Sequence, residues 1–549
     1  MVFIGAENIV SPLGNSAAEN YANISEGKTA VSVKPIGVNQ EGFAVASFED
    51  KKDLLGLCLR SFEESLTHVD RDKIEGKTAL IFSSTKGEIN ALNERMAPYS
   101  ISALSKKLSE PYPFISETFT ISNACVSGIM ALNLGRDLIQ GGNFDHVVVV
   151  GGDLASDFTV AGFQAFFAMS DEVCRPYDKD RKGINLGEAA STVWLSKSNT
   201  IFRGDAFYVL GGATRNDANH ISGPSRTGEG LFRAFEAAKR SAQIQVKDLD
   251  YICSHGTATN YNDEMESQAF KRANLLEVPM NSLKGYFGHT LGAAGLVEAS
   301  IALQSIRHQK LVASLGFEFS GVSYPLNVID RSRPQSIKTI VKTGSGFGGC
   351  NSAIVISKQP KKEIVQLDGP IALLGEVTIN QEQVTVNDQV KLKLGEDPLR
   401  EMYDDLELNY SKFHKMDPLC KLGVLGVEYL LGALPELKNA GDEEVGLVIE
   451  SKWGSSFSDL AHQKQLELKN PSPAIFVYTL PNIVLGEISI KHKWYGESIC
   501  LISEGSGEQS KAVADLYLKM GKIKYALQGN IEYIEGSFEL SLSAWAKKA

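Results

Sequence analysis

The sequence has few cysteines, few prolines and no long apolar run, and each shortage excludes a class of protein. Its seven cysteines among 549 residues are scattered and form no CxxC pair, which excludes a secreted-type disulfide framework and indicates a reducing compartment. The 18 prolines against 50 glycines indicate close backbone approaches rather than disordered linkers. No stretch approaches the roughly 20 apolar residues of a membrane helix, so no membrane association is expected.

The sequence also has fewer basic than acidic residues. Lys and Arg number 55 against 66 Asp and Glu, a net charge of −11, which argues against nucleic acid as the main partner. The first residues, MVFIGAENIVSPLG, have no basic region before their apolar ones, so a strand and turn are expected there rather than a signal peptide. These features predict a soluble, cytoplasmic protein.

Length and hydrophobic patterning predict a layered α/β protein with more than one folding unit. The chain exceeds the size of an ordinary single domain. Short runs that are apolar on both faces are typical of strands in a mostly parallel sheet, and here they alternate with helical segments. The predicted strands are 79–83, 147–150, 250–253, 339–342 and 353–357, and the predicted helices are 52–69, 126–140, 230–243 and 292–309.

The clearest boundary is the polar stretch KQPKKE at 358–363. It separates a first unit, 1–358, from a second, 364–549, which has an ordinary single-domain size. The second unit resembles the first half of the first one: LIFSSTKGE at 80–88 has a counterpart in LVIESKWGS at 447–455. We therefore expect a degenerate, non-catalytic half copy.

The comparison extends to the first candidate for chemistry, Cys125. It lies in SNACVSG, between a predicted strand and a predicted helix, and Gly505 takes its place in the copy. The positive end of a helix dipole favours a thiolate, and small neighbours such as Ala124 and Gly128 leave room for a thioester to approach the backbone. The alternative is a buried structural cysteine.

Two histidines follow in glycine-rich surroundings. His255 begins HGTAT after a short strand, a position where catalytic groups of α/β sheets gather, and Thr257 and Thr259 add hydroxyls to the same loop. Lys284 and His289 lie five residues apart in KGYFGHTLGAAG, where an ammonium would tend to hold an imidazole neutral. Capping or core histidines and a solvated lysine are the alternatives.

A fourth motif is the glycine-rich GSGFGGCN at 344–351, which contains Phe347. It lacks the GxxxxGK[ST] pattern of a phosphate loop. A flexible loop that presents backbone N–H groups and one aromatic ring is the preferred interpretation.

Together these motifs resemble one family, the type II β-ketoacyl-(acyl-carrier-protein) synthases of the thiolase-like superfamily. The resemblance covers residues 1 to about 357 and includes IVSPLG, ACVSG, FFAMS, RPYDKDRKGINLGEAA, HGTATNYND, KGYFGHTLGAAG and GFGGCN. It implies a layered α-β-α-β-α fold in the first unit, with half of the same fold in the smaller C-terminal α/β domain.

The resemblance also implies a decarboxylative Claisen condensation. Cys125 would carry the acyl group, while His255 and His289 would bind malonyl-acyl carrier protein, promote loss of CO₂ and stabilise the enolate. Lys284 would hold the histidine pair electrostatically, in company with Glu266.

Further roles follow from the same resemblance. The backbone N–H groups of Cys125 and Phe347 would form an oxyanion hole, with Phe347 also gating the acyl pocket. Thr257 and Thr259 would contact the phosphopantetheine arm, and Asn351 would have a structural role. No metal and no bound cofactor are implied, because phosphopantetheine arrives on the acyl carrier protein.

The chain departs from the family in a shortened stretch at 86–113, whereas the second unit retains a comparable segment at 481–496. Family members pair through the strand before the nucleophile, so one hypothesis makes the second unit a built-in dimer partner; an inert appendage, or a partner subunit joined in one chain, is the other. A homodimer, or a heterodimer with a chain-length-factor-like unit, is also compatible with the sequence. Alternative functions are a biosynthetic thiolase, and a non-catalytic chain-length factor or scaffold. The acyl-chain length and the pathway, fatty acid or polyketide and polyene, are left open.

Overall fold

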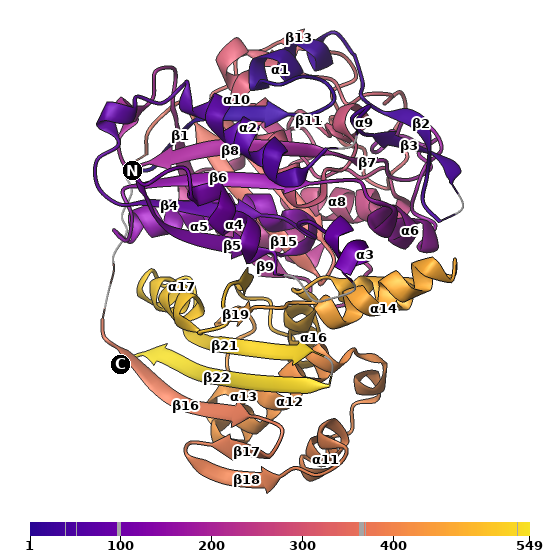
Figure 1. Ribbon diagram of the computed structural model, residues 1–549. Helices are drawn as coiled ribbons and strands as arrows, with labels where there is room; N and C mark the ends of the chain where they lie inside the picture. The colour runs from indigo at the N-terminus through magenta and orange to yellow at the C-terminus, as the bar shows by residue number, and fades with distance from the viewer. Residues whose placement is uncertain are drawn as a thin grey trace.

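The computed structural model describes residues 1–38, 40–50, 52–95, 100–361, 367, 369–534 and 536–548. Figure 1 shows two bodies, one built from the indigo to pink elements and one from the orange and yellow elements that follow residue 370. The predicted start of the second unit, residue 364, lies outside the described residues, so the boundary stays a prediction.

The first sheet of the upstream unit carries the nucleophile at the end of its edge strand. β4 is parallel to both β5 and β6, whereas β8 is antiparallel to β6 and β1. In order across the sheet, the strands are β5 (Ile115–Ile121), β4 (Thr78–Ser83), β6 (His146–Asp153), β8 (Ala189–Ser196) and β1 (Phe3–Val10).

The second sheet carries the histidine loop. β10 is parallel to β11 and β14, whereas β15 is antiparallel to β14 and β9. In order, the strands are β11 (Met280–Asn281), β10 (Tyr251–Cys253), β14 (Thr339–Gly346), β15 (Cys350–Ser357) and β9 (Phe207–Asn216). The expectation of mostly parallel sheets is therefore wrong for the outer strands, because an apolar run shows that a strand is buried but not which way it runs.

Two buried helices separate these sheets. α5 (Ser127–Gln140) contacts β6 and β15, and α10 (Ala294–His308) contacts β8 and β14. They cross closely, because an added Cβ on Gly295 would lie 2.6 Å from the backbone N of Ile129. Gly128 thus serves helix packing, with its own Cβ position 3.0 Å from Leu296 N, rather than substrate access.

Outer helices complete the layers. α2 (Leu54–Leu66) packs on β1, β6 and β8, while α7 (Glu229–Ala242) packs on β9 and β15. The order is therefore α-β-α-β-α, as expected, and each strand and helix predicted for this unit is present. The remaining elements are α1 (Ala17–Ser25), β2 (Ser32–Ile36), β3 (Glu41–Ala46), α3 (Asn90–Arg95), α4 (Ser102–Ser109), α6 (Asp157–Ala165), β7 (Leu186–Gly187), α8 (Asn260–Arg272), α9 (Lys284–Phe287), β12 (Lys310–Leu311) and β13 (Arg333–Pro334).

The second unit repeats the topology of the first sheet. β19 is parallel to β20 and β21, and β22 is antiparallel to β21 and β16, so β20, β19, β21, β22 and β16 correspond to β5, β4, β6, β8 and β1. Gly505 lies between β20 and helix α17, as Cys125 lies between β5 and α5. The expected half copy is present. Its elements are β16 (Ile371–Ile379), β17 (Gln383–Val386), β18 (Gln389–Lys393), α11 (Pro398–Asp405), α12 (Pro418–Ala433), α13 (Pro435–Lys438), β19 (Val445–Ser451), α14 (Ser456–Glu467), α15 (Pro473–Phe476), α16 (Ile483–His492), β20 (Ser498–Ile502), α17 (Glu508–Lys519), β21 (Tyr525–Ile534) and β22 (Ser537–Lys547).

The two units join through the strand that precedes Cys125. β20 runs antiparallel to β5, with Leu501 opposite Ile121. Ser122 N donates to the carbonyl of Cys500 at 3.2 Å, and Cys500 N donates to Asn123 Oδ1 at 2.8 Å. The structure thus contains the pairing that a built-in partner requires.

A buried ion pair reinforces the same junction. Lys86 Nζ lies 2.8 Å from Asp459 Oδ1, and the two side chains are 4% and 6% exposed. The ammonium also donates to the carbonyl of Thr479 and lies 5.3 Å from the centre of the Phe158 ring. Each unit therefore supplies one charge of a pair that neither unit buries alone.

Across the described parts of the chain, no single helix has both the length and the apolar character of a membrane span. The segments 473–479 and 483–492 reach that composition only as a pair bent by 102°.

Candidate active site

A pocket of about 350 Å³ brings the predicted site residues together. Its wall includes the predicted nucleophile, both histidines, both threonines and the aromatic residue of the glycine-rich loop: Cys125, His255, Thr257, Thr259, His289 and Phe347. Lys284 and Glu266 do not line it and lie behind the His255 loop. Segments more than 200 residues apart in sequence thus meet in one cavity.

Cys125 lies in a sharp turn between β5 and α5. Ala124 has a φ of 48°, a left-handed conformation that side chains with a Cβ rarely adopt, and such strain costs on the order of 1–3 kcal/mol. The Ser127 hydroxyl holds the turn, because its Oγ accepts from Asn123 N at 2.8 Å and donates to the Ala124 carbonyl at 2.6 Å. This turn conformation places Cys125 at the pocket wall, just before the central helix α5.

Burial controls the protonation of Cys125. Burial raises the pKa of its thiol to about 12, although the charge of Lys284 acts in the opposite direction. Burial therefore opposes the thiolate that a helix N-terminus favours, and the resting chain holds a thiol. The thiol must give up its proton as it reacts.

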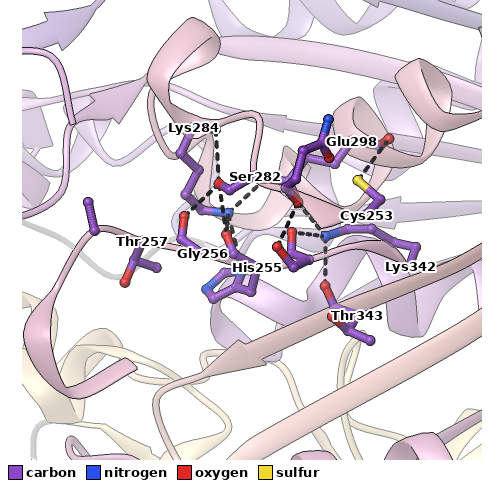
Figure 2. Close-up of polar contacts among 12 residues, drawn as sticks. Cys253, His255, Gly256, Thr257, Ser282, Lys284, Glu298, Lys342 and Thr343 are labelled. Carbon is purple, nitrogen blue, oxygen red and sulfur yellow. Dashed lines mark hydrogen bonds and ion pairs between the residues drawn. The ribbon is translucent and has the colours of Figure 1, made fainter. Parts of the chain in front are cut away.

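His255 is fixed by Lys284. The Lys284 ammonium donates to the His255 carbonyl at 2.6 Å and lies 3.2 Å from His255 Nδ1, as Figure 2 shows. An ammonium can only donate, so Nδ1 is an acceptor and the ring hydrogen of a neutral His255 is on Nε2. His255 therefore has a hydrogen-bond donor to offer on its other nitrogen.

His289 is held by its backbone and leaves its ring free. Its N donates to Asn185 O at 2.7 Å, and its carbonyl accepts from Gly187 N at 3.0 Å. Within the described residues neither ring nitrogen has a hydrogen-bond partner. The two imidazole centres lie 5.3 Å apart with planes at 85°, so both rings are available to one small group in the pocket.

Both histidines are neutral near pH 7. Burial, followed by the positive charge of Lys284, lowers the pKa of His255 and of His289 well below the ordinary value, and Lys342 adds to the effect. The expected neutralising action of Lys284 is confirmed in direction, but burial is the larger cause.

This arrangement predicts a loss of stability in acid. Below pH 6.5 an unfolded histidine takes up a proton that buried His289 refuses, so the free energy of unfolding falls as the pH falls. Between pH 7.5 and 5.5 we expect about 1.4 kcal/mol per histidine, measured by urea denaturation at both pH values. His289→Gln should lessen the pH dependence by that amount, and an unchanged dependence in this variant would contradict the assignment.

The partner of Lys284 is not the expected one. Lys284 Nζ pairs with Glu298 Oε1 at 2.7 Å, and Lys342 Nζ lies 2.6 Å from the other oxygen of Glu298. Glu266 instead accepts from the backbone N of His255 at 3.0 Å and of Gly256 at 2.7 Å. Glu266 thus shapes the histidine loop rather than accompanying Lys284.

Glu298 and Lys342 were missed by the sequence reasoning, although each had a signal. Glu298 is the single acidic residue in the apolar stretch GLVEASIALQ, and Lys342 is the single charge in TIVKT. A charged residue in an apolar element is buried only when paired, so each implies an unseen partner.

The glycine-rich loop presents backbone donors to the pocket. In the described turns and loops, the N–H groups of Cys125 and Phe347 donate to no backbone carbonyl. An added Cβ on Gly346 would lie 3.2 Å from Cys125 N, so glycine keeps the space over this donor open. The site can therefore accommodate an oxyanion beside the nucleophile.

The downstream unit holds the same loop in place. Asn482 Nδ2 donates to the Phe347 carbonyl at 2.8 Å, and a Cβ on Gly486 would lie 2.7 Å from Gly348 O. Phe476 also packs on Phe163, a residue of the pocket wall, at 5.6 Å between ring centres. The loop is thus tied down rather than freely flexible, and the sequence offered no signal for this long-range contact.

The other predicted residues have local partners. The hydroxyls of Thr257 and Thr259 are 2.8 Å apart at the pocket wall. Asn351 donates to Asp217 Oδ1 at 3.1 Å and accepts from Ser345 at 2.7 Å, which agrees with a structural role. Among the described residues, no group of three or more His, Cys, Asp or Glu is arranged to hold a metal ion.

The sequence is similar to known β-ketoacyl synthases. Residues 67–200 match the β-ketoacyl synthase N-terminal domain and residues 207–318 its C-terminal domain. The ketoacyl synthase alpha subunit of the tetracenomycin polyketide synthase of Streptomyces glaucescens is 34% identical over 256 residues, which cover 44% of this chain and 60% of that protein. The 3-oxoacyl-[acyl-carrier-protein] synthase 2 of Coxiella burnetii is 28% identical over 410 residues, 65% of this chain and 98% of that one.

One solved structure resembles the whole chain. The PfaC keto synthase–chain length factor structure matches 100% of this chain and 78% of its own, with a TM-score of 0.77 and 15% identity. At this identity the likeness concerns the fold alone, and that fold includes the second unit.

Proposed function

Because the chain belongs to the β-ketoacyl synthase family, we propose that it is an acyltransferase that extends acyl chains by decarboxylative Claisen condensation. The observation that supports this most directly is the pocket that contains Cys125 together with two neutral histidines. The substrates are an acyl thioester and malonyl-acyl carrier protein, and the product is a β-ketoacyl thioester.

In the first half-reaction Cys125 takes the acyl group. Its sulfur attacks the thioester carbonyl, a new C–S bond forms, and the bond to the pantetheine sulfur breaks. Because the resting thiol is protonated, its proton must move to the departing sulfur, and a neutral imidazole in the pocket can relay it. A covalent thioester splits the reaction into two easier steps.

In the second half-reaction the malonyl group loses CO₂. The electron pair of the broken C–C bond passes into the thioester and forms an enolate, whose oxygen accepts hydrogen bonds from His255 and His289. The enolate carbon then attacks the acyl carbonyl on Cys125, the N–H groups of Cys125 and Phe347 stabilise the tetrahedral oxyanion, and the cysteine sulfur leaves. Such preorganised donors are often the largest contribution to a rate enhancement.

Gly346→Ala tests the oxyanion hole. The methyl group would lie 3.2 Å from Cys125 N, within the space that the oxyanion needs, so we expect condensation to fall about 10²-fold. Decarboxylation of malonyl-acyl carrier protein should change little, because the histidines are untouched. Parallel kinetic assays of the two reactions check this, and an equal loss in both would contradict the assignment.

The rival functions have less support. A thiolase needs a second catalytic cysteine, but Cys350 does not line the pocket, and its Sγ accepts hydrogen bonds from Asn123 and Asn482 at the junction. A chain-length factor for the whole chain is disfavoured by the complete set of Cys125 and two histidines.

We further propose that phosphopantetheine enters past Thr257 and Thr259 while attached to the acyl carrier protein, with no resident cofactor. The second unit would act as a built-in partner in a cytoplasmic pseudo-dimer, serving fatty-acid or polyketide chain assembly.

The decisive experiment is mixing the full chain with acyl- and malonyl-acyl carrier proteins and analysing both proteins by intact mass spectrometry. An acyl adduct on the chain, followed by a β-ketoacyl product on the carrier, supports the proposal. No adduct with any carrier, in a folded chain, would refute it.

A further inference from the structure

Behind His255, two lysines share one carboxylate. Lys284 and Lys342 are each 0% exposed and Glu298 is 3% exposed, and the carboxylate lies 2.7 Å from one ammonium and 2.6 Å from the other. Figure 2 shows the three side chains beside the strand that leads to His255. They come from α9, β14 and α10, so the fold assembles the cluster from three separate elements.

The charges of this cluster do not cancel. Lys284 and Glu298 alone would be neutral, and Lys342 brings the sum to +1. We propose that Lys342 is a positioning residue of the active site, which supplies the positive charge that Glu298 removes from Lys284 and so keeps a net charge of +1 behind the two histidines. This proposal rests on the proposed function, because an excess buried cation is useful only where negative charge develops.

The contacts of Lys342 connect it to the histidine loop. Its ammonium donates to the carbonyl of Ser254, the residue before His255, at 3.0 Å, and to that of Thr343 at 2.6 Å. Cys253, at the end of β10, is the register partner of Lys342 on β14. The ammonium thus has two carbonyl acceptors and an ion-pair contact with Glu298, and it lies directly behind the strand end that carries His255.

The sharing of Glu298 also bears on Lys284. A carboxylate that serves two ammonium groups polarises each less than one that serves a single group, so Lys284 remains a strong donor to His255 Nδ1. That hydrogen bond places the His255 ring hydrogen on Nε2. Lys342 therefore acts on the reaction through Lys284 and His255.

A purely structural role explains the cluster less well. One lysine already neutralises Glu298, and an additional buried charge costs stability unless it is compensated. Burial has the largest single effect on the pKa of Lys342 and lowers it, but Glu298, Cys253 and Glu266 together raise this pKa above its ordinary value, so Lys342 remains charged. Glu266 offsets part of this charge, and the negative charge of an enolate in front of the histidines would compensate the rest.

Other ionisable groups face the same site and must be considered in any titration. They are Cys125 at the start of α5, Asp153 on β6, Cys253 on β10, Asp263 and Glu266 on α8, Lys284 on α9 and Glu298 on α10. None of these groups changes in a comparison of variants at position 342 alone.

The test is a charge cycle on the full chain. Lys342→Met changes the net charge of the cluster from +1 to zero. Combining it with Glu298→Gln returns the net charge to +1, which is then carried by Lys284 alone. Histidine labelled with ¹³C allows the titration of His255 and His289 to be followed by NMR, and malonyl-acyl carrier protein decarboxylation gives kcat and KM. Lys522→Met, a partly buried lysine paired with Asp137 and Glu497, is the control.

In Lys342→Met we expect the histidine midpoints to rise by about one pH unit and kcat to fall about 10- to 100-fold, with KM little changed. The double variant should lower the midpoints again and recover part of kcat, whereas the control should leave the midpoints unchanged. A double variant that is as slow as Lys342→Met, with unmoved midpoints, would overturn the proposal.

Failure of the proposed function and failure of the role of Lys342 give different experimental results. If the unaltered chain does not decarboxylate any malonyl carrier, the proposed function fails, but the histidine titrations still report on the charge of the cluster. If the unaltered chain is active and the titration midpoints of the histidines are the same with and without Lys342, only the proposed role of Lys342 is refuted.

Discussion

Replacing Cys125 with alanine will leave the chain unable to take up an acyl group and will reduce condensation by on the order of 10⁴-fold or more. The thiol is the only nucleophile that the described pocket wall offers at the start of a central helix. Without it no covalent intermediate can form. Intact mass spectrometry after incubation with acyl-acyl carrier protein measures the loading directly.

The same variant should retain decarboxylation of malonyl-acyl carrier protein. His255 and His289 make no hydrogen bond to Cys125 in the described structure, so their positions do not depend on the sulfur. Cys350→Ala is the matched control, because this thiol ends the glycine-rich loop 344–351 beside the site but faces Asn123 and Asn482. Loading that persists in Cys125→Ala, or disappears in Cys350→Ala with an intact fold, would show that the nucleophile has been misassigned.

Lys86→Met is expected to destabilise the chain by about 3–5 kcal/mol. The substitution leaves Asp459 as a buried carboxylate without its cation, and breaking one side of a buried ion pair has about this cost. The Ser455 hydroxyl at 3.2 Å cannot replace the ammonium. Urea denaturation, followed both by tryptophan fluorescence and by far-UV circular dichroism, measures the change.

The double variant Lys86→Met with Asp459→Leu distinguishes the effect of the lost ion pair on stability from the effect of altered side-chain packing. Because it removes both charges, much of the lost stability should return. Lys197→Met is the control, since Lys197 pairs with Asp145 at the surface and such pairs contribute at most about 1 kcal/mol. If the double variant is no more stable than Lys86→Met, the cost arises from shape rather than from charge.

The sequence predicted those parts of the fold that depend on local patterns. Apolar runs and helical periodicity identified each strand and helix assigned in advance, and the repeated segments revealed the half copy. Strand direction was not predictable in this way, because β8 and β15 have the same apolar character whether they run parallel or antiparallel to their neighbours. Direction depends on the connections between elements, which local composition does not encode.

In the candidate site, too, the features that depend on local sequence were predictable and those that depend on distant elements were not. The motifs around Cys125, His255 and His289 were recognisable because glycines and small residues surround each one. The partner of Lys284 was not, since Glu298 approaches from another element. The effect of burial on the pKa of Cys125 was not predictable either, because a helix dipole can be inferred from neighbouring residues whereas burial is a property of the completed fold.

The strand pairing between β5 and β20 has a consequence for how the assembly behaves on dilution. Two separate chains that meet edge to edge come apart at low concentration, but here both edges belong to one polypeptide, so closure is a first-order event with no concentration term. The ratio of the two halves is fixed at synthesis, and unequal expression cannot leave one half unpaired. The β5 edge is also occupied, which removes the site at which a second catalytic unit would otherwise add its own strand.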